Sequence, residues 1–323
     1  PGPYGPWERW GMTVTRRMAL GLAALGRPAY INVGREGALP PRRTAEAMRS
    51  ATHQVLDAAY AAGVRWVDAA RSYGRSEEFL AGWLDARGHR DVTVSSKWGY
   101  AYVGEWRMDA DVHEVKEHSL ERFRAQLAET RRLLGAHLAV YQVHSLTPDS
   151  PLFGDAALRN ALAELAAGGV RVGFSTSGPA QADTVRRALE LEAGGQRLFS
   201  TVQSTWNLLE PSVAAALGEA HDAGAHVIVK EGLANGRLAA DPPEPLRRAA
   251  ERHGTGPDAV ALAAALAQPW ADTVLSGAVS VEQLTANLAA ETITLAPDEA
   301  AELRGLTTPA ADYWHARSAL PWN

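Results

Sequence analysis

The most constraining feature of the sequence is a repeated alternation of short apolar segments with longer amphipathic ones. The short apolar runs lie at 18–25, 63–68, 91–97, 137–144, 170–176, 199–205, 225–230 and 272–277. Strands that are apolar throughout are buried on both faces, as in parallel sheets covered by helices. Stretches with helical spacing separate the runs, and examples are 44–63, 113–135 and 183–195. Eight strand–helix units of this kind predict an α/β fold, the (β/α)8 TIM barrel.

An open, doubly wound sheet is the alternative arrangement for this pattern. A glycine-rich dinucleotide fingerprint after the first strand would favour it, but GLAALGRP at 21–28 does not match. The length of 323 residues suits one barrel, and no long linker or low-complexity tract divides the chain. We therefore expect a single domain, 1–323, with an N-terminal hairpin that caps the barrel bottom. The aromatic tail at 307–323 shows no helical pattern, and we expect it to cross the active-site mouth as a loop.

Composition excludes several functional classes. The net charge of −5 is too modest for a dedicated nucleic-acid-binding protein. The absence of cysteine excludes disulfides, iron–sulfur clusters and cysteine-ligated zinc, and we expect no metal site. No apolar run is long enough to predict a membrane-spanning helix. Residues 15–26 resemble a twin-arginine signal, but their apolar run is short, and we interpret them as the first hairpin and core strand of a cytoplasmic protein.

Four polar side chains follow the predicted strands where barrel enzymes carry their chemistry, at the carboxyl ends. Asp68 ends the second strand, Lys97 the third and His144 the fourth, and Tyr73 lies in the loop after the second. Lys97 can pair with Asp68 and lower the pKa of Tyr73 toward neutrality, which would make the phenol a usable general acid. His144 can bind a substrate carbonyl or relay the proton. Each residue alone has a structural explanation, but their joint occurrence favours catalysis.

Six segments resemble, in order, signature segments of the aldo-keto reductases. They are GVRWVDAARSYGRSEEFLAGWL, VSSKWGY, LAVYQVHS, VRVGFSTSGP, TVQSTWNLLEP and VLSGAVSVEQLTANLAA, and the resemblance runs from about residue 18 to about residue 290. It implies a (β/α)8 barrel that binds NADP(H) in extended form, without a Rossmann fold, and transfers a hydride to an aldehyde or ketone. It also implies that Tyr73 donates the proton, that Asp68 and Lys97 tune it, and that His144 orients the substrate.

The same resemblance implies a cofactor site along the later strands. Its candidate residues are Ser175, Thr176, Gln203, Lys230, Glu231, Leu233, Arg237, Gly277, Gln283 and Asn287. Thr176 replaces an asparagine, and Lys230 stands where many members carry an aromatic ring that stacks on the nicotinamide. Glu231 adds an anion that Lys230 or Arg237 would have to neutralise. Val279 replaces an arginine that would grip the 2′-phosphate, so we expect NADP(H) to bind with weak discrimination against NAD(H).

The substrate site is less specified by the sequence. Trp98, Trp206 and Trp314 are the candidate walls of a pocket for a small carbonyl or alcohol compound. We therefore expect an NADP-dependent carbonyl reductase or alcohol dehydrogenase with no nucleic-acid or membrane partner; the sequence does not specify an oligomeric state. Two alternatives stay open: a cofactor-binding regulatory subunit on the same fold, and a lyase or epimerase that uses the cofactor without net redox change.

Overall fold

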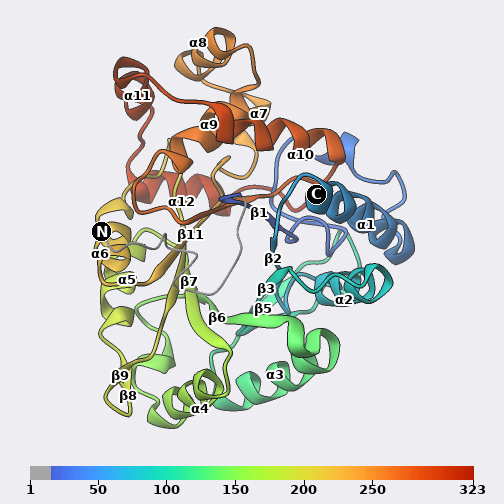
Figure 1. The fold of residues 1–323 in the computed structure, drawn as a ribbon, viewed down its shortest axis with the longest axis vertical. Helices are drawn as coiled ribbons and strands as arrows, with labels where there is room; N and C mark the ends of the chain where they lie inside the picture. Colours follow the sequence, from blue (N-terminus) through green and yellow to red (C-terminus); the bar gives the residue numbers. More distant parts are fainter. Residues whose placement is uncertain (1–15) are drawn as a thin grey trace.

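A closed barrel of parallel strands forms the centre of the molecule (Figure 1). The computed structural model describes residues 16–323, and the predicted N-terminal hairpin falls largely on residues 1–15, outside that part. The barrel strands are β1 (Met18–Gly21), β2 (Trp66–Asp68), β3 (Thr93–Trp98), β6 (Leu138–Leu146), β7 (Arg171–Thr176), β10 (Thr201–Thr205), β11 (His226–Lys230) and β12 (Thr273–Ser276). Their order is β1-β12-β11-β10-β7-β6-β3-β2, and parallel pairing of β1 with β2 closes the ring. The predicted (β/α)8 barrel is confirmed, and each predicted apolar run overlaps one of its strands.

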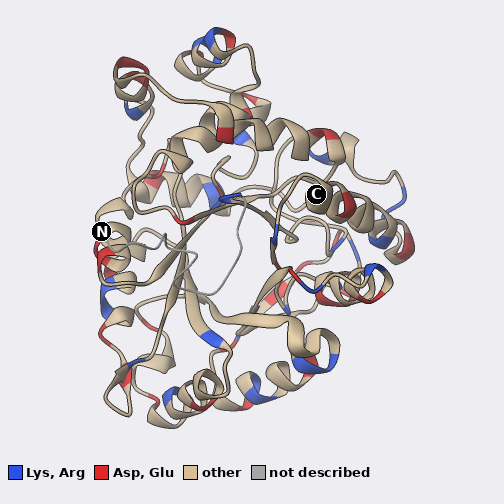
Figure 2. Cartoon of the chain, viewed as in Figure 1, with Lys and Arg blue, Asp and Glu red and all other residues tan. Residues whose placement is uncertain are grey.

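Helices surround the barrel on its outer side (Figure 1). They are α1 (Ala45–Ala61), α2 (Ser76–Arg87), α3 (Leu120–Leu134), α4 (Ala156–Ala167), α5 (Gln181–Leu189), α6 (Ala214–Asp222), α7 (Arg237–Ala240), α8 (Glu244–His253), α9 (Pro257–Leu266), α10 (Val281–Leu288), α11 (Pro297–Arg304) and α12 (Ala310–Ser318). Figure 2 shows charged residues mainly on this outer layer, with few on the barrel strands. Among residues 16–323, no helix has the length and apolarity needed to cross a membrane.

Two predicted helices are shorter than their sequence patterns indicated. The helix expected at 113–135 begins at Leu120, because Ser119 caps it by accepting a hydrogen bond from the Arg122 amide. The residues before it form β5 (Glu114–Lys116), which pairs antiparallel with β4 (Tyr100–Tyr102). This β4–β5 hairpin places residues at the mouth of the barrel.

The helix expected at 183–195 ends at Leu189, and its last residues form another hairpin. Here β8 (Glu192–Ala193) pairs with β9 (Gln196–Arg197). The turn between them is Gly194–Gly195, both at positive φ, a conformation that glycine adopts without steric cost.

The C-terminal tail also differs from its prediction. Residues Ala310–Ser318 form helix α12 instead of a loop, and this helix begins directly after Pro309. Tyr313 and Trp314 are its buried residues, so the aromatic side chains anchor the helix. The tail nevertheless reaches the barrel mouth, as predicted, because its residues Arg317, Ser318 and Trp322 line the cavity there.

The barrel interior is filled below the site by a compact apolar cluster. The cluster comprises Ala19, Trp66, Val140, Ile228 and Leu275, with the His226 ring stacked on Trp66 at 5.0 Å. Side chains alternate along a strand, so Trp66 and Asp68 point to the same side of β2. The cluster thus forms an apolar layer below the polar residues at the strand ends.

Close contact between strands at Gly173 offers a test of the barrel. A Cβ atom there would collide with the side chain and carbonyl oxygen of Thr201 on the neighbouring strand. We expect Gly173→Ala to lower the free energy of unfolding by about 1–3 kcal/mol, the usual cost of overpacking. The exposed helical Gly82 has open space where a Cβ would lie, so Gly82→Ala should stabilise the protein by about 0.5–1 kcal/mol. Urea denaturation measures both; a Gly173→Ala protein as stable as the wild type would contradict the packing.

Candidate active site

A buried ion pair stands at the centre of the site. The Lys97 ammonium on β3 pairs with the Asp68 carboxylate at the end of β2, and both side chains are almost fully buried. Lys97 Nζ also donates to the Ala69 carbonyl at 3.1 Å. Ser95 Oγ donates to Asp68 Oδ1 at 2.6 Å, and Gln203 Nε2 approaches the same oxygen at 3.3 Å. These hydrogen bonds offset the cost of removing two charges from water.

Tyr73 is held beside this pair by close packing of two loops. Gly26 in the loop after β1 and Gly74 in the loop after β2 pack against each other, and a side chain at either would collide with the other loop. Gly74 has a φ of 58°, and the Arg75 amide donates to the Gly26 carbonyl at 2.7 Å. The Tyr73 ring therefore has a defined position, with Lys97 Nζ 4.8 Å from its centroid.

The predicted direction of the Tyr73 pKa shift is wrong. Burial, followed by the negative charge of Asp68, raises the pKa of Tyr73 well above its usual value of 10, and Arg27 opposes this rise. The reason is that the ring is only 8% exposed, so the phenolate would lose its hydration. Tyr73 therefore keeps its proton at neutral pH.

His144 on β6 lies next to Tyr73 at the mouth of the barrel. The two rings are 5.4 Å apart in an edge-to-face arrangement. Burial and then the positive charges of Lys97, Lys230 and Arg27 lower the pKa of His144 well below 6.5, so the ring is neutral. Its Nδ1 lies 3.3 Å from Ser72 Oγ. Where Ser72 donates to Nδ1, the ring proton is on Nε2, which is then the available donor.

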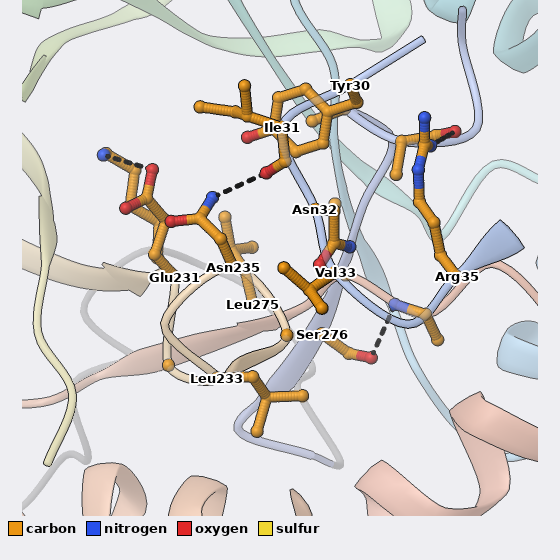
Figure 3. A pocket seen from close by; sticks show the side chains of 18 of the residues that line it. Tyr30, Ile31, Asn32, Val33, Arg35, Glu231, Leu233, Asn235, Leu275 and Ser276 are labelled. Atoms are coloured by element: carbon orange, nitrogen blue, oxygen red, sulfur yellow. Dashed lines mark hydrogen bonds and ion pairs between the residues drawn. The ribbon is translucent and has the colours of Figure 1, made fainter. Parts of the chain in front are cut away.

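A cavity of about 560 Å³ runs from these residues along the mouth of the barrel. Asp68, Tyr73 and His144 line it, and Lys97 lies behind Asp68. Of the predicted cofactor residues, those that line it are Gln203, Lys230, Glu231, Leu233, Gly277, Gln283 and Asn287. Figure 3 shows one part of its wall, where the segment Tyr30–Val33 lies opposite the Glu231–Asn235 loop. A hydrogen bond of 3.0 Å from Asn235 Nδ2 to the Ile31 carbonyl joins the two segments.

Three predicted cofactor residues are not part of this lining. Ser175 accepts a hydrogen bond from the Ser145 amide at 2.8 Å, and Thr176 bonds Ser204 Oγ at 2.7 Å, so both hydroxyls are used inside the protein. The Arg237 guanidinium packs on the Tyr313 ring at 4.6 Å. Arg237 therefore stabilises helix α12 against the loop after β11.

The three predicted tryptophan walls also lie outside the cavity lining. Trp98 packs on Phe123 of helix α3, Trp206 on Trp270, and Trp314 on Tyr313. Trp98 directly follows Lys97, and alternation along the strand turns its side chain toward the helices. The aromatic residues that do line the cavity are Tyr30, Tyr73, Tyr100 and Trp322.

Arg27 is the main lining residue that the sequence reasoning missed. Its guanidinium lies among the rings of Tyr30, Trp322 and Tyr73, at 4.6, 5.0 and 5.1 Å from their centroids. It also forms an ion pair of 2.7 Å with Glu114 of the β4–β5 hairpin. The available signal was its position, since Arg27 follows the first strand and hence stands at the mouth.

A second charge cluster occupies the place expected for a stacking aromatic ring. Lys230 Nζ donates to Thr205 Oγ1 at 2.8 Å and lies 3.5 Å from Glu231. Arg317 of helix α12 binds both oxygens of Glu231, at 2.9 and 2.5 Å. Burial raises the pKa of Glu231, but Arg317 and Lys230 outweigh it and bring the value to about 2. The anion is therefore neutralised by Lys230 and Arg317, and not by Arg237.

The lining fits a nicotinamide dinucleotide. Gln203 Oε1 is buried without a hydrogen-bond partner among the described residues, although its Nε2 is turned toward Asp68. An orphaned carbonyl oxygen in the lining of the cavity, on a side chain that reaches Asp68, suits the amide group of a nicotinamide. Farther along, Gly277 has open space in the direction where a Cβ would lie, which leaves room for a ligand against the backbone.

This geometry defines a class of protein: a (β/α)8 barrel with an acid–base site and an elongated cavity at its mouth. The model of the aldo/keto reductase family matches residues 17–307. The chain therefore belongs to the aldo/keto reductase family, whose members are oxidoreductases that use nicotinamide cofactors.

Individual relatives are distant. Aldo-keto reductase str7 of Strobilurus tenacellus is 26% identical over 284 residues, which cover 78% of this chain and 80% of that protein. An aryl-alcohol dehydrogenase [NADP(+)] of Phanerodontia chrysosporium is 29% identical over 106 residues, 30% of this chain and 26% of that protein. The holo structure of aldo-keto reductase AKR11C1 from Bacillus halodurans superposes with a TM-score of 0.66 at 20% identity, covering 91% of this chain and 93% of that one. At this identity the structural match supports the fold.

The ion pair can be tested by removing its cation. Lys97→Met should leave the Asp68 carboxylate buried and unpaired, at a cost of about 3–5 kcal/mol in the free energy of unfolding. The double variant Lys97→Met with Asp68→Asn removes the uncompensated charge and should recover much of that loss. Denaturation of both variants measures the effect; equal stability of the single and double variants would exclude the coupling.

Lys230 predicts a specific dependence of stability on pH. Burial is the largest cause that lowers the pKa of Lys230 to about 8, whereas the unfolded chain keeps this proton to about pH 10.4. The cost of burying the charge is thus present below pH 8 and is relieved as the proton leaves the folded protein above pH 8. Relative to Lys230→Met, the wild type should gain about 1 kcal/mol between pH 7 and pH 9. Urea denaturation across this range tests it, and a constant difference would contradict the shift.

Proposed function

We propose that the protein reduces an aldehyde or ketone with a nicotinamide cofactor and that Tyr73 is the proton donor. The observation that carries the proposal is the placement of Tyr73 and His144 on one wall of the cavity, with the Asp68–Lys97 pair directly behind Tyr73. A neutral phenol and a neutral imidazole can both donate hydrogen bonds to one carbonyl oxygen. This arrangement suits reduction of a carbonyl, in which oxygen gains a proton as carbon gains a hydride.

The protonation state of each residue determines its role in the proposed reaction. A bound nicotinamide cofactor would supply the hydride, and Gln203 together with the Gly277 region would hold it. Tyr73 gives its proton to the substrate oxygen, and the resulting tyrosinate lies beside the Lys97 ammonium, whose charge stabilises it. Asp68 holds Lys97 in place. His144 orients the carbonyl by donating from Nε2, because its low pKa keeps the ring neutral.

The cavity suits a planar substrate. Tyr30, Tyr100 and Trp322 present aromatic surfaces, and the Arg27–Glu114 pair adds a polar edge near Tyr73. Such surfaces favour flat, partly apolar compounds. An aryl aldehyde is therefore the substrate class to test first, in line with the activity named for the relative from Phanerodontia chrysosporium. The sequence favours NADP(H), with weak discrimination against NAD(H). The residues that surround the adenosine half of the cofactor determine which of the two binds more tightly.

Tyr73→Phe should reduce the rate of aryl-aldehyde reduction by about 10²–10⁴-fold, the range that general acid catalysis supplies. Cofactor affinity should change little, because the ring and its packing remain. Absorbance of the reduced cofactor measures turnover, and quenching of tryptophan fluorescence measures binding. The nearby variant Tyr100→Phe is the matched control and should keep most of the activity.

These measurements also separate the alternatives. Tight cofactor binding without turnover of any aldehyde would favour a regulatory subunit. Product formation without net consumption of cofactor would favour a lyase or epimerase. Near-normal turnover by Tyr73→Phe would refute Tyr73 as the proton donor.

A further inference from the structure

The end of the cavity that lies at helix α9, which packs against α10 and β12, carries an acidic side chain. Asp258 lines the cavity together with Ala239, Ala240, Gln283 and Asn287. It is the second residue of helix α9, which follows Gly256 and begins at Pro257. No hydrogen bond or ion pair joins its half-buried carboxylate to another residue in the described part of the chain. An unpaired anion on the wall of a binding cavity is a feature that a ligand can use.

This end is where the adenosine half of a dinucleotide would lie. Hydride transfer requires the nicotinamide to lie beside Tyr73, so the other half of an extended cofactor must occupy the opposite end of the cavity. Gln283 and Asn287 lie on α10, Gly277 directly follows β12, and both elements pack against α9, which carries Asp258. This step rests on the proposed function, because it assumes that the cavity binds a nicotinamide dinucleotide.

No basic side chain in the described part of the chain is available to hold a 2′-phosphate at this end. Each basic residue that lines the cavity is committed elsewhere: Arg27 to Glu114, Lys230 to Thr205, Arg317 to Glu231, and Arg35 to the carbonyl oxygens of Ala24 and Asn323. Figure 3 shows the Arg35 side chain extending away from Leu233 and Ser276.

Val279, which stands where related proteins carry an arginine, does not supply a contact for a 2′-phosphate either. Val279 is 1% exposed and is not part of the cavity lining, and its amide donates to Gln283 Oε1 at 3.0 Å. Arg237, stacked on Tyr313, is likewise absent from the lining. The adenosine end therefore presents one carboxylate with amides and small side chains.

We infer that Asp258 makes this protein prefer NAD(H) over NADP(H). A carboxylate accepts hydrogen bonds from the 2′- and 3′-hydroxyls of the adenosine ribose, as acidic residues do in other dinucleotide sites. The same carboxylate repels a 2′-phosphate, which carries two negative charges near neutral pH, and each lining cation is already held by the partners named above. Gly256 contributes to the geometry, because a side chain there would collide with Asp258 Oδ1.

A structural role for Asp258 makes a different prediction. Acidic residues in the first turn stabilise a helix by interacting with its dipole, whether or not they touch a ligand. Glu282 occupies the same kind of position in helix α10 and is exposed, outside the cavity lining. Glu282→Gln is therefore the matched control, since it removes one negative charge from a neighbouring helix start without altering the cavity.

The test is a titration of the purified protein with NADH and, separately, with NADPH. Binding is measured by the quenching of tryptophan fluorescence, because Trp322 lies in the cavity wall. We expect the wild type to bind NADH roughly 10- to 100-fold more tightly than NADPH, the range of a hydrogen bond to a charged group. Asp258→Asn should reduce this ratio about 10-fold, mainly by tighter NADPH binding. Asp258→Ser should act in the same direction, and Glu282→Gln should leave the ratio unchanged.

Thermal unfolding of each variant shows whether a change in affinity reflects loss of fold. The inference is overturned if the wild type binds NADPH as tightly as NADH or more tightly. It is also overturned if Asp258→Asn and Asp258→Ser both keep the wild-type fold and the wild-type ratio of NADH to NADPH affinity. Absence of saturable binding of either cofactor would instead overturn the proposed function.

Discussion

The buried Asp68–Lys97 ion pair is the interaction on which the site depends. Two charges removed from water need each other, and they also need the hydrogen bonds that Ser95, Gln203 and the Ala69 carbonyl supply. The apolar layer around Trp66 keeps water from the lower side of the pair. A charge held in such surroundings is strong, because little solvent screens it. In the proposed mechanism, this charge stabilises the tyrosinate that Tyr73 becomes, even though burial makes the phenol a weak acid on its own.

The rest of the mouth follows the same rule of local neutralisation. Arg27 pairs with Glu114, and Glu231 pairs with both Lys230 and Arg317. The pairs that Arg27 and Arg317 make join segments far apart in the chain, so charge pairing also fastens the β4–β5 hairpin and helix α12 around the cavity. Asp258 is the exception, because its carboxylate faces the cavity without a cation among the described residues. An unpaired carboxylate on the wall of a binding cavity is a reason to assign it a role toward a ligand.

Much of the barrel and of the central site could be predicted because the signals are local. A buried strand has a short apolar run, and the residue near its carboxyl end stands at the mouth. In the structure Asp68 and His144 line one cavity, and Lys97 lies behind Asp68. Some expectations that depended on the direction of a side chain differ from the structure. Trp98 follows Lys97 in the sequence, yet its side chain packs on helix α3. Arg237 follows a loop that lines the cavity, yet its side chain packs on Tyr313.

The sequence by itself determined the barrel, the order of its strands and the set of residues at their carboxyl ends, because hydrophobic periodicity and strand ends are properties of neighbouring residues. Only the tertiary structure decided how charges from distant segments combine. The pKa of Tyr73 rises because the folded protein removes solvent around it, which no local pattern reports. Likewise, Arg317 reaches Glu231 across 86 positions of the chain. Burial and long-range charge pairing arise only when distant segments meet in the folded protein. They therefore cannot be predicted from any one local segment of the sequence.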